Sequence, residues 1–332
     1  MTMRTVSDVA LQEVREPDYE AVARLHTAAY PDTPTTAAEV RDWVRVQVDR
    51  GLYSQWILAA EQHTQAVVGG VWFHQRMVHP QKYFLRGYVH PDWAHRGIGR
   101  RLLEAALEVL HARGAQDVKS FAREDQPRSV AFLQHAGFTE IGRDFESRLA
   151  VAACNLTPFA GSIDQTRALG IELTTLADEL TRDPTCLRGV YQAHCALGFA
   201  IPGEDPDLPA PVPYETYRAW QVDHPLVLQD AYFLAKRGDV FVGESAMKRS
   251  AVDGGVLHQE LTAVVAEYRG RGVATALKVL TIQYAQRHRF REIRTFNSSR
   301  NAAMLAINTK MGFLRQPEWI LFAKALSNES TR

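Results

Sequence analysis

The sequence predicts an α/β protein built from two tandem copies of one domain. The chain has 332 residues, about twice the length of a typical domain of about 150 residues. Gly97 and Gly272 are 175 positions apart, and so are Gly137 and Gly312, each of which precedes a phenylalanine. The segment between the first glycine and the Gly-Phe pair therefore has the same length in both copies. This indicates a duplicated domain rather than a solenoid of short repeats.

The composition is typical of a soluble globular protein, with 46% hydrophobic and 23% charged residues. The 38 Lys and Arg residues balance the 38 Asp and Glu residues, which argues against a nucleic-acid partner, because such proteins need a basic surplus. No apolar run approaches the length of a membrane span, and no signal peptide is expected. The three cysteines, Cys154, Cys186 and Cys195, lack the spacing of a disulfide framework or a zinc site. We therefore expect a cytoplasmic protein without a metal or membrane partner.

The first copy, residues 1–151, contains helical and strand-like patterns. Its helices are expected at residues 18–26, 36–48, 100–113 and 128–136. Its strands are expected at residues 55–60, 66–73, 83–89, 118–122 and 145–151. The helix at 100–113 has the clearest pattern, because its apolar residues recur at helical spacing and Gly114 can end it.

The second copy, residues 166–332, repeats this plan after an expected linker at residues 152–165. Its strands are expected at residues 231–235, 240–247, 256–265, 293–296 and 318–325. Its helices are expected at residues 275–287 and 301–311, in register with the corresponding helices of the first copy.

A glycine-rich turn joins a strand to a long helix in each copy. In the second copy the turn reads Arg269-Gly-Arg-Gly272, directly before the helix. Glycine lets the backbone approach a ligand, and the first amides of a helix attract anions, so the turn is typical of a pyrophosphate cradle. A glycine-rich connection without a ligand is the alternative, and two copies in the same context argue against it. A P-loop is excluded, because the pattern GxxxxGK[ST] is absent. A Rossmann fingerprint, GxGxxG, is also excluded, because Leu102 occupies the position of the third glycine after Gly97 and Gly99.

The segment Arg269-x-x-Gly272-x-Ala274 resembles motif A of the GCN5-related N-acetyltransferases (GNAT), which bind acetyl-coenzyme A through this turn. The segment from Asn301 to Gly312-Phe313 is similar to the Asn and Gly-Phe segment of the same family. The tandem arrangement resembles the architecture of mycothiol synthases. This resemblance implies that each copy is a mixed, mostly antiparallel twisted sheet flanked by helices, and that acetyl-CoA is the co-substrate.

The resemblance also implies which residues hold the coenzyme. In the second copy these are Val264, Val265, Arg269, Gly270, Arg271, Gly272, Val273, Ala274 and Asn301. In the first copy they are Val89, Arg96, Gly97, Ile98 and Gly99.

The first copy departs from the family pattern. Ala94 stands where Arg or Gln is expected, and the later helix lacks a counterpart of Asn301. No Asp or Glu occurs between Glu61 and Asp92, which covers the strands that flank the acceptor. His74, His79 and His90 lie in that span, and a structural role is favoured for each. We therefore expect a degenerate, non-catalytic first domain and a catalytic second domain.

Two strand carboxylates of the second copy are candidates for the general base. Strand alternation predicts that Glu260 shares a face with His258 and Thr262, and Glu244 lies in the neighbouring strand. Glu260 is the first choice and Glu244 the second; a solvated strand carboxylate is the alternative. By the resemblance, a backbone amide near Val264 or Val265 would stabilise the oxyanion. The family's tyrosine acid is replaced by Asn308, and by Leu133 in the first copy.

These observations predict transfer of an acetyl group to the amine of a small molecule, by direct attack in a ternary complex. The segment 199–214 has five prolines and three acidic residues, Glu204, Asp205 and Asp207. Either it covers the acceptor site and attracts an amine, or it is a solvated loop. The alternatives are a non-catalytic acyl-CoA-binding or regulatory protein and a protein N-terminal acetyltransferase. A monomer is compatible with the sequence, because two copies in one chain can mimic a dimer of single-copy relatives.

Overall fold

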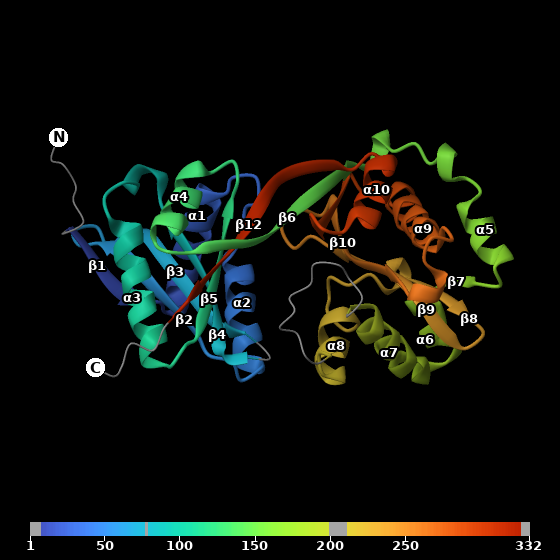
Figure 1. The fold of residues 1–332 in the computed structure, drawn as a ribbon, viewed down its shortest axis with the longest axis horizontal. Helices are drawn as coiled ribbons and strands as arrows, with labels where there is room; N and C mark the ends of the chain where they lie inside the picture. The colour runs from blue at the N-terminus through green and yellow to red at the C-terminus, as the bar shows by residue number, and fades with distance from the viewer. Residues whose placement is uncertain (1–7, 77–78, 199–210, 327–332) are drawn as a thin grey trace. The chain divides into compact units, whose positions relative to one another are not determined.

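The computed structural model describes residues 8–76, 79–198 and 211–326. These residues form two compact units, each a sheet flanked by helices (Figure 1). Unit 1 contains residues 8–141 and 320–326, and unit 2 contains residues 142–319. The predicted fold class, two tandem α/β domains with mostly antiparallel sheets, is confirmed.

The two units exchange their last strands. Strand β6 (Thr139–Ala150) ends the first repeat, yet from Gly142 on it belongs to unit 2, where it pairs antiparallel with β11 (Glu292–Ser298). Strand β12 (Leu314–Ala325) ends the second repeat, and from Ile320 on it belongs to unit 1. The domain boundaries expected from the sequence did not include this exchange. A sequence repeat shows that the strands follow in the same order in both copies, but it does not show which sheet each strand joins.

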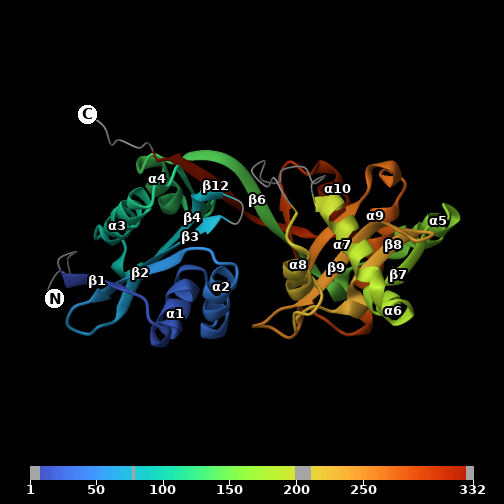
Figure 2. The ribbon, with the colours of Figure 1, turned by 90° about the horizontal axis from the view of Figure 1, so that it is seen from below.

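Unit 1 has the strand order β1-β2-β3-β4-β5-β12. The strands are β1 (Val9–Glu13), β2 (Ser54–Glu61), β3 (Val67–Arg76), β4 (His79–Val89) and β5 (Asp117–Arg123). Strands β1 to β4 are antiparallel, whereas β4 and β5 are parallel. Two helices lie on each face of the sheet (Figure 2): α1 (Tyr19–Ala29) and α2 (Ala37–Asp49) on one, α3 (Ile98–Ala112) and α4 (Pro127–His135) on the other.

Unit 2 has the strand order β6-β11-β10-β9-β8-β7. Its other strands are β7 (Glu172–Thr175), β8 (Phe233–Arg237), β9 (Val240–Arg249) and β10 (Val256–Val264). Among its described strands, β10 and β11 pair in parallel and the other neighbours pair antiparallel. Helices α9 (Val273–Arg287) and α10 (Ala302–Met311) lie on the opposite side from α7 (Leu187–Gly198) and α8 (Tyr214–Gln221) (Figure 1).

The predicted helices and strands are confirmed, and most of their ends are shifted by a few residues. The strands expected at 145–151 and 318–325 begin earlier than expected, by up to six residues. Helix α3 packs Leu102, Leu103, Ala106 and Leu110 into the core of unit 1, as its spacing predicts. The structure also contains elements that were not predicted: β1 in unit 1, and β7, α5 (Ser162–Ala168), α6 (Leu176–Arg182), α7 and α8 in unit 2. Helix α5 belongs to unit 2, although its first residues were expected in a linker.

Aromatic side chains fill the space between the α1–α2 face and the sheet of unit 1. Trp72 stacks between Trp43 and Trp56, with ring centroids 6.0 and 5.7 Å away. His26 meets Tyr88 edge to face, and His74 lies 4.4 Å from Trp72. Burial lowers the pKa of both His26 and His74 to about 4. Both imidazoles are therefore neutral at pH 7, and they pack among aromatic rings.

We expect unit 1 to lose stability as the pH falls from 6.5 toward 4. In this window the unfolded chain binds protons at His26 and His74 that the folded chain excludes, so unfolding becomes more favourable as acid is added. Urea unfolding at pH 7 and pH 5 measures the effect. His74→Gln should weaken the pH dependence, whereas His63→Gln, on an exposed turn, should leave it unchanged. Equal pH dependence in wild type and His74→Gln would contradict this account.

Candidate active site

The site begins where β10 and β11 separate. The two strands pair only from Val256 to Gln259, opposite residues 292–295, although β10 continues to Val264 and β11 to Ser298. A cavity of about 450 Å³ lies at this separation. It is lined by His258, Gln259, Glu260, Leu261, Thr262, Lys278, Arg294, Thr295, Phe296, Asn297, Ser298, Asn301 and Met304.

A β-bulge shapes the β10 side of the cavity. Gln259 pairs with Met247 and Thr262 with Ser245, so Glu260 and Leu261 together face one residue of β9. Side chains of a strand point alternately to the two faces of the sheet, and the bulge shifts this alternation by one residue in β10. Glu260 therefore reaches the Lys248 side of the sheet, whereas the Thr262 hydroxyl bonds Ser245 Oγ at 2.7 Å on the other side. The prediction that Thr262 shares a face with Glu260 is wrong for this reason.

Glu260 is a partly exposed carboxylate on the cavity wall. Its side chain is 34% exposed, and Oε2 lies 3.5 Å from Lys248 Nζ. His258 lines the same cavity and pairs opposite Lys248 in the strand register. The structure therefore places a carboxylate and an imidazole on the cavity wall, with the Lys248 ammonium beside the carboxylate. A carboxylate and an imidazole are groups that can move a proton.

Glu244 lies in a different, buried environment. It is 2% exposed, accepts a hydrogen bond from the Tyr232 hydroxyl, and lies 2.7 Å from His194 Nδ1. The Tyr217 and Tyr232 hydroxyls are 3.1 Å apart. Burial and, after it, the Glu244 carboxylate raise the pKa of both tyrosines. Glu244 does not line the cavity at the separation of β10 and β11.

The glycine turn adopts the backbone conformation that an anion cradle needs. Gly270 and Gly272 have φ of +71° and +86°, and a Cβ at either position would meet no atom within 4 Å. Gly272 caps α9, whose first intrahelical bond runs from the Ala276 amide to the Gly272 carbonyl. The amides of Val273 and Ala274 therefore point out of the helix end, where they attract negative charge.

Val264 and Val265, at the end of β10, connect this turn to the separated strands. Arg269 Nε donates to the Val264 carbonyl at 2.9 Å, and the Val265 amide donates to Val242 of β9. Because hydrogen bonds alternate along a strand, the Val264 peptide faces away from β9, on the β11 side. Of the two amides proposed for an oxyanion, that of Val264 is the one directed to the open side. The Arg271 guanidinium lies 5.7 Å from the ring centre of Tyr268, just before the turn.

Unit 1 retains the turn conformation with a different sequence. His95 and Gly97 have φ of +62° and +78°, matching Gly270 and Gly272 of unit 2. Arg96 Nη2 bonds the Asp92 carbonyl at 2.7 Å and its guanidinium covers the Trp93 ring. In the same unit Ile98 is buried, and a Cβ on Gly99 would lie 3.6 Å from Val89.

Asparagines complete the α10 side of the cavity. Asn301 lines it and caps α10 by accepting a hydrogen bond from the Met304 amide at 3.3 Å. Asn308 is 2% exposed, and its Nδ2 donates to Asn297 at 2.7 Å. Asn308 therefore supports the cavity wall through Asn297, and as an amide it is not a proton donor of the tyrosine kind.

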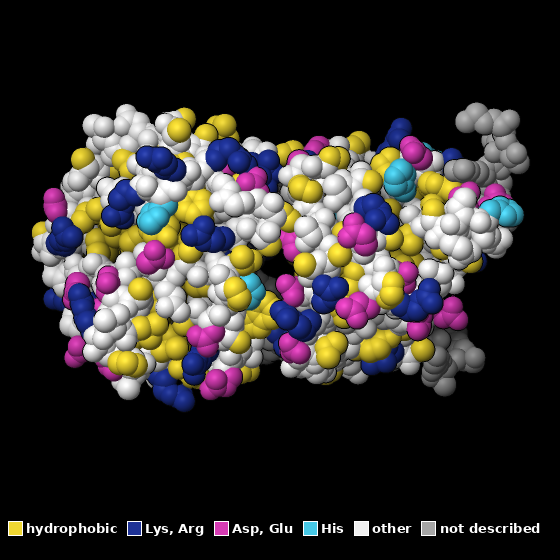
Figure 3. Space-filling view, turned by 180° about the vertical axis from the view of Figure 1, so that it is seen from behind, with side chains coloured by type: hydrophobic (Ala, Val, Ile, Leu, Met, Phe, Trp, Pro, Cys, Tyr) yellow, Lys and Arg dark blue, Asp and Glu magenta, His cyan; other side chains and the backbone are white. Residues whose placement is uncertain are grey.

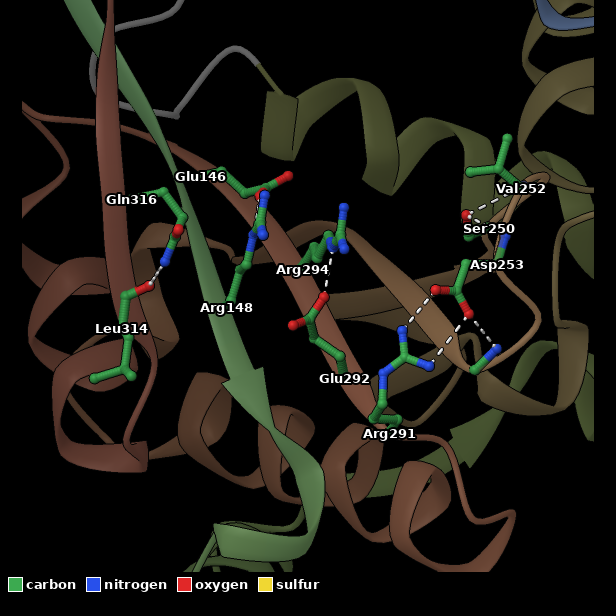
Figure 4. A network of polar contacts seen from close by, with 11 residues as sticks. Glu146, Arg148, Ser250, Val252, Asp253, Arg291, Glu292, Arg294, Leu314 and Gln316 are labelled. Atoms are coloured by element: carbon green, nitrogen blue, oxygen red, sulfur yellow. Dashed lines mark hydrogen bonds and ion pairs between the residues drawn. The ribbon is translucent and has the colours of Figure 1, made fainter. Parts of the chain in front are cut away.

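Charged side chains along β6 and β11 neutralise one another beside the cavity (Figure 4). Arg294, which lines the cavity, bonds Glu292 at 2.6 Å, and the opposing Arg148 bonds Glu146 at 2.5 Å. Lys and Arg side chains are likewise interspersed with Asp and Glu on the molecular face in Figure 3.

Two residues of unit 2 were missed by reasoning from the sequence. His194 comes from α7, far from Glu244 in the chain, and no local pattern links them. Lys278 lies within the apolar stripe of α9, at the position of Leu103 in the first repeat. That interruption of the stripe was the available signal.

No three metal-ligating side chains gather within residues 8–76, 79–198 and 211–326 in a way that could hold an ion. In the same part of the chain, none of the helices combines the length and the apolar character needed to span a membrane. The three cysteines are free thiols.

The acetyltransferase (GNAT) family profile matches residues 11–138 and 200–313. The chain therefore belongs to the GNAT family, and the resemblance drawn from its motifs is confirmed for both repeats.

Several known proteins are similar to this chain. A mycothiol acetyltransferase of Beutenbergia cavernae is 26% identical over 128 residues, which cover 38% of this chain and 43% of that protein. One from Clavibacter michiganensis is 37% identical over 62 residues, 19% of this chain and 20% of that protein. The matches thus span less than half the length of these relatives.

Solved structures share the fold over almost the whole chain. A GCN5-related N-acetyltransferase from Sphaerobacter thermophilus has a TM-score of 0.72 at 18% identity, covering 97% of both chains. A tandem GNAT protein from the clavulanic acid biosynthesis pathway has a TM-score of 0.69 at 18% identity, covering 97% of this chain and 100% of that one.

The buried cluster around Glu244 predicts energetic coupling between Tyr232 and Glu244. Tyr232→Phe removes a donor from a buried carboxylate and should cost about 1–3 kcal/mol of unfolding free energy. In a Glu244→Leu background the same change should cost much less, because the acceptor is gone. Urea unfolding of the four proteins of this cycle measures the coupling; additive effects would show that the hydrogen bond contributes nothing.

Proposed function

We propose that the chain is an acyl-CoA-dependent N-acyltransferase, which moves an acetyl group from acetyl-CoA to the amine of a small molecule. The observation that carries the proposal is the separation of β10 and β11 over a cavity, with a helix-capping glycine turn directly after β10. The chemistry is assigned to unit 2, with direct attack of the amine in a ternary complex.

The turn at 269–274 fits a diphosphate. Open space at Gly270 and Gly272 lets an anion approach the backbone, and the α9 dipole favours negative charge there. Arg269 and Arg271 add positive charge beside the turn. Bound acetyl-CoA would supply an activated thioester, and the cavity between β10 and β11 has room for the arm that carries it.

Glu260 is our choice for the general base. A typical alkyl amine has a pKa of about 10.4 and is mostly protonated at pH 7, so a base must remove its proton. Glu260 lines the cavity, whereas Glu244 is buried and engaged by Tyr232 and His194. The Val264 amide, directed to the open side of β10, is the proposed oxyanion donor.

The acceptor is proposed by class only. Two relatives are named as mycothiol acetyltransferases, which supports a small-molecule amine rather than a protein terminus. The acidic residues expected to attract that amine, Glu204, Asp205 and Asp207, lie outside the described residues.

Unit 1 is proposed to be a non-catalytic copy. It retains the turn conformation at His95 and Gly97. It has no counterpart of Asn301, since Gln126 occupies the cap of α4 without a side-chain capping bond. No carboxylate stands on β3 or β4.

Arg269→Ala should weaken CoA binding about tenfold, because a charged donor beside the diphosphate is lost. Arg96→Ala should change the affinity less. Isothermal titration with CoA gives both dissociation constants and the number of sites per chain. Equal losses in the two variants would contradict the assignment of the coenzyme to unit 2.

Glu260→Gln should lower kcat by about a hundredfold or more while CoA affinity stays the same. The measurement is release of free CoA thiol from acetyl-CoA with a panel of small amines. Glu267→Gln, an exposed carboxylate before the turn, is the matched control. An unaffected rate in Glu260→Gln would remove Glu260 as the base, and tight CoA binding without turnover of any amine would favour a non-catalytic acyl-CoA-binding protein.

A further inference from the structure

A buried lysine without an acidic partner lines the cavity of unit 2. Lys278 is 1% exposed, and its Nζ donates to Gln259 Oε1 at 2.5 Å. The same nitrogen lies 4.6 Å from the ring centre of Phe313. Among the described residues, no carboxylate forms an ion pair with it. Burying an unpaired ammonium is costly, so this side chain needs an explanation.

The partner of Lys278 is itself fixed in place. Gln259 is 4% exposed, and its Nε2 donates to Ser245 Oγ at 2.9 Å and to Thr281 Oγ1 at 3.2 Å. Both amide hydrogens are thereby used, which leaves Oε1 directed at Lys278. The network holds the amine at the cavity wall rather than letting it extend toward solvent.

The fold itself does not require this polar network. Helices α3 and α9 match at an offset of 175, which places Leu103 at the position of Lys278. The strand registers place Leu85 at Gln259 and Val71 at Ser245. Unit 1 thus fills the same positions with apolar side chains from its core. The buried lysine and its polar network are therefore specific to unit 2.

The environment of Lys278 favours the uncharged amine. Burial lowers its pKa to about 7, against about 10.4 for an exposed lysine. The other ionisable groups on the cavity are His258 and Glu260 from β10 and Arg294 from β11. Glu260 is paired with Lys248, and Arg294 with Glu292. The fraction of free, nucleophilic amine at neutral pH is therefore much larger for Lys278 than for an exposed lysine.

We propose that Lys278 is a covalent modification site, at which this protein takes the acyl group from an acyl thioester bound in the same cavity. This inference rests on the proposed function, because the thioester is the one assigned to the cavity above. In the step, the Lys278 nitrogen forms a bond to the acyl carbon and the carbon–sulfur bond breaks. One proton passes from nitrogen to the thiolate, so the products are an amide and free CoA thiol.

The product suits its surroundings and closes the site. An acyl-lysine is neutral, so the cost of a buried charge disappears, and its N–H can still donate to Gln259 Oε1. The acyl group then occupies the cavity that a new thioester needs. Because an amide is stable, the modification is a lasting self-inactivation rather than a turnover intermediate.

Incubating the whole chain with acetyl-CoA, followed by peptide mass spectrometry, tests the proposal. At pH 7 the acetylation rate of Lys278 should saturate with acetyl-CoA and exceed that of the exposed Lys310 by about tenfold or more, since its free-amine fraction is about a thousandfold larger. The Lys278 rate should level off above pH 7, whereas the Lys310 rate keeps rising to pH 9.

Lys278→Leu, which installs the residue of unit 1, is the control variant. It should lose time-dependent inactivation by acetyl-CoA. Two results would overturn this inference alone, in a chain that binds CoA and acetylates amines. In the first, Lys278 stays unmodified; in the second, Lys278 is acetylated only as fast as Lys310 and its rate does not saturate with acetyl-CoA. A chain that does not bind CoA overturns the proposed function together with it.

Discussion

The candidate site depends on two parallel strands that stop pairing partway along their length. Wherever β10 and β11 separate, backbone groups lose their neighbours, and a sheet tolerates this only if something else meets them. In unit 2 the separated segment is bordered by the bulge at Glu260–Leu261, by the Arg269 contact to Val264, and by the capped end of α10. The cavity, the direction of the Val264 peptide and the position of the glycine turn all follow from this separation.

Because the domain is duplicated, the two units can be compared to find which features both share and which occur in unit 2 and not in unit 1. Both units have a residue with positive φ two positions before the capping glycine, although it is His95 in one and Gly270 in the other. The turn is thus preserved where its sequence is not. Behind the turn the units diverge, because Lys278 and Gln259 of unit 2 stand where unit 1 has Leu103 and Leu85.

Periodicity and turn residues were sufficient to predict most helices and strands and the glycine turn, because those signals are local. The bulge could not be predicted, since it depends on which residues face each other across β9 and β10. It adds one residue to β10, so that the offset between repeats is 174 at Tyr83 and Leu257 but 175 at Gly87 and Thr262. The contact of His194 with Glu244 and the exchange of β6 and β12 are equally long-range, and no pattern within one segment reports them.

The most direct test of the central claim is a crystal structure of the chain with CoA. We predict that the diphosphate lies on the amides of Val273 and Ala274, with the attached arm between β10 and β11 of unit 2. A coenzyme that binds only to unit 1, or that leaves the separation of β10 and β11 empty, would contradict it.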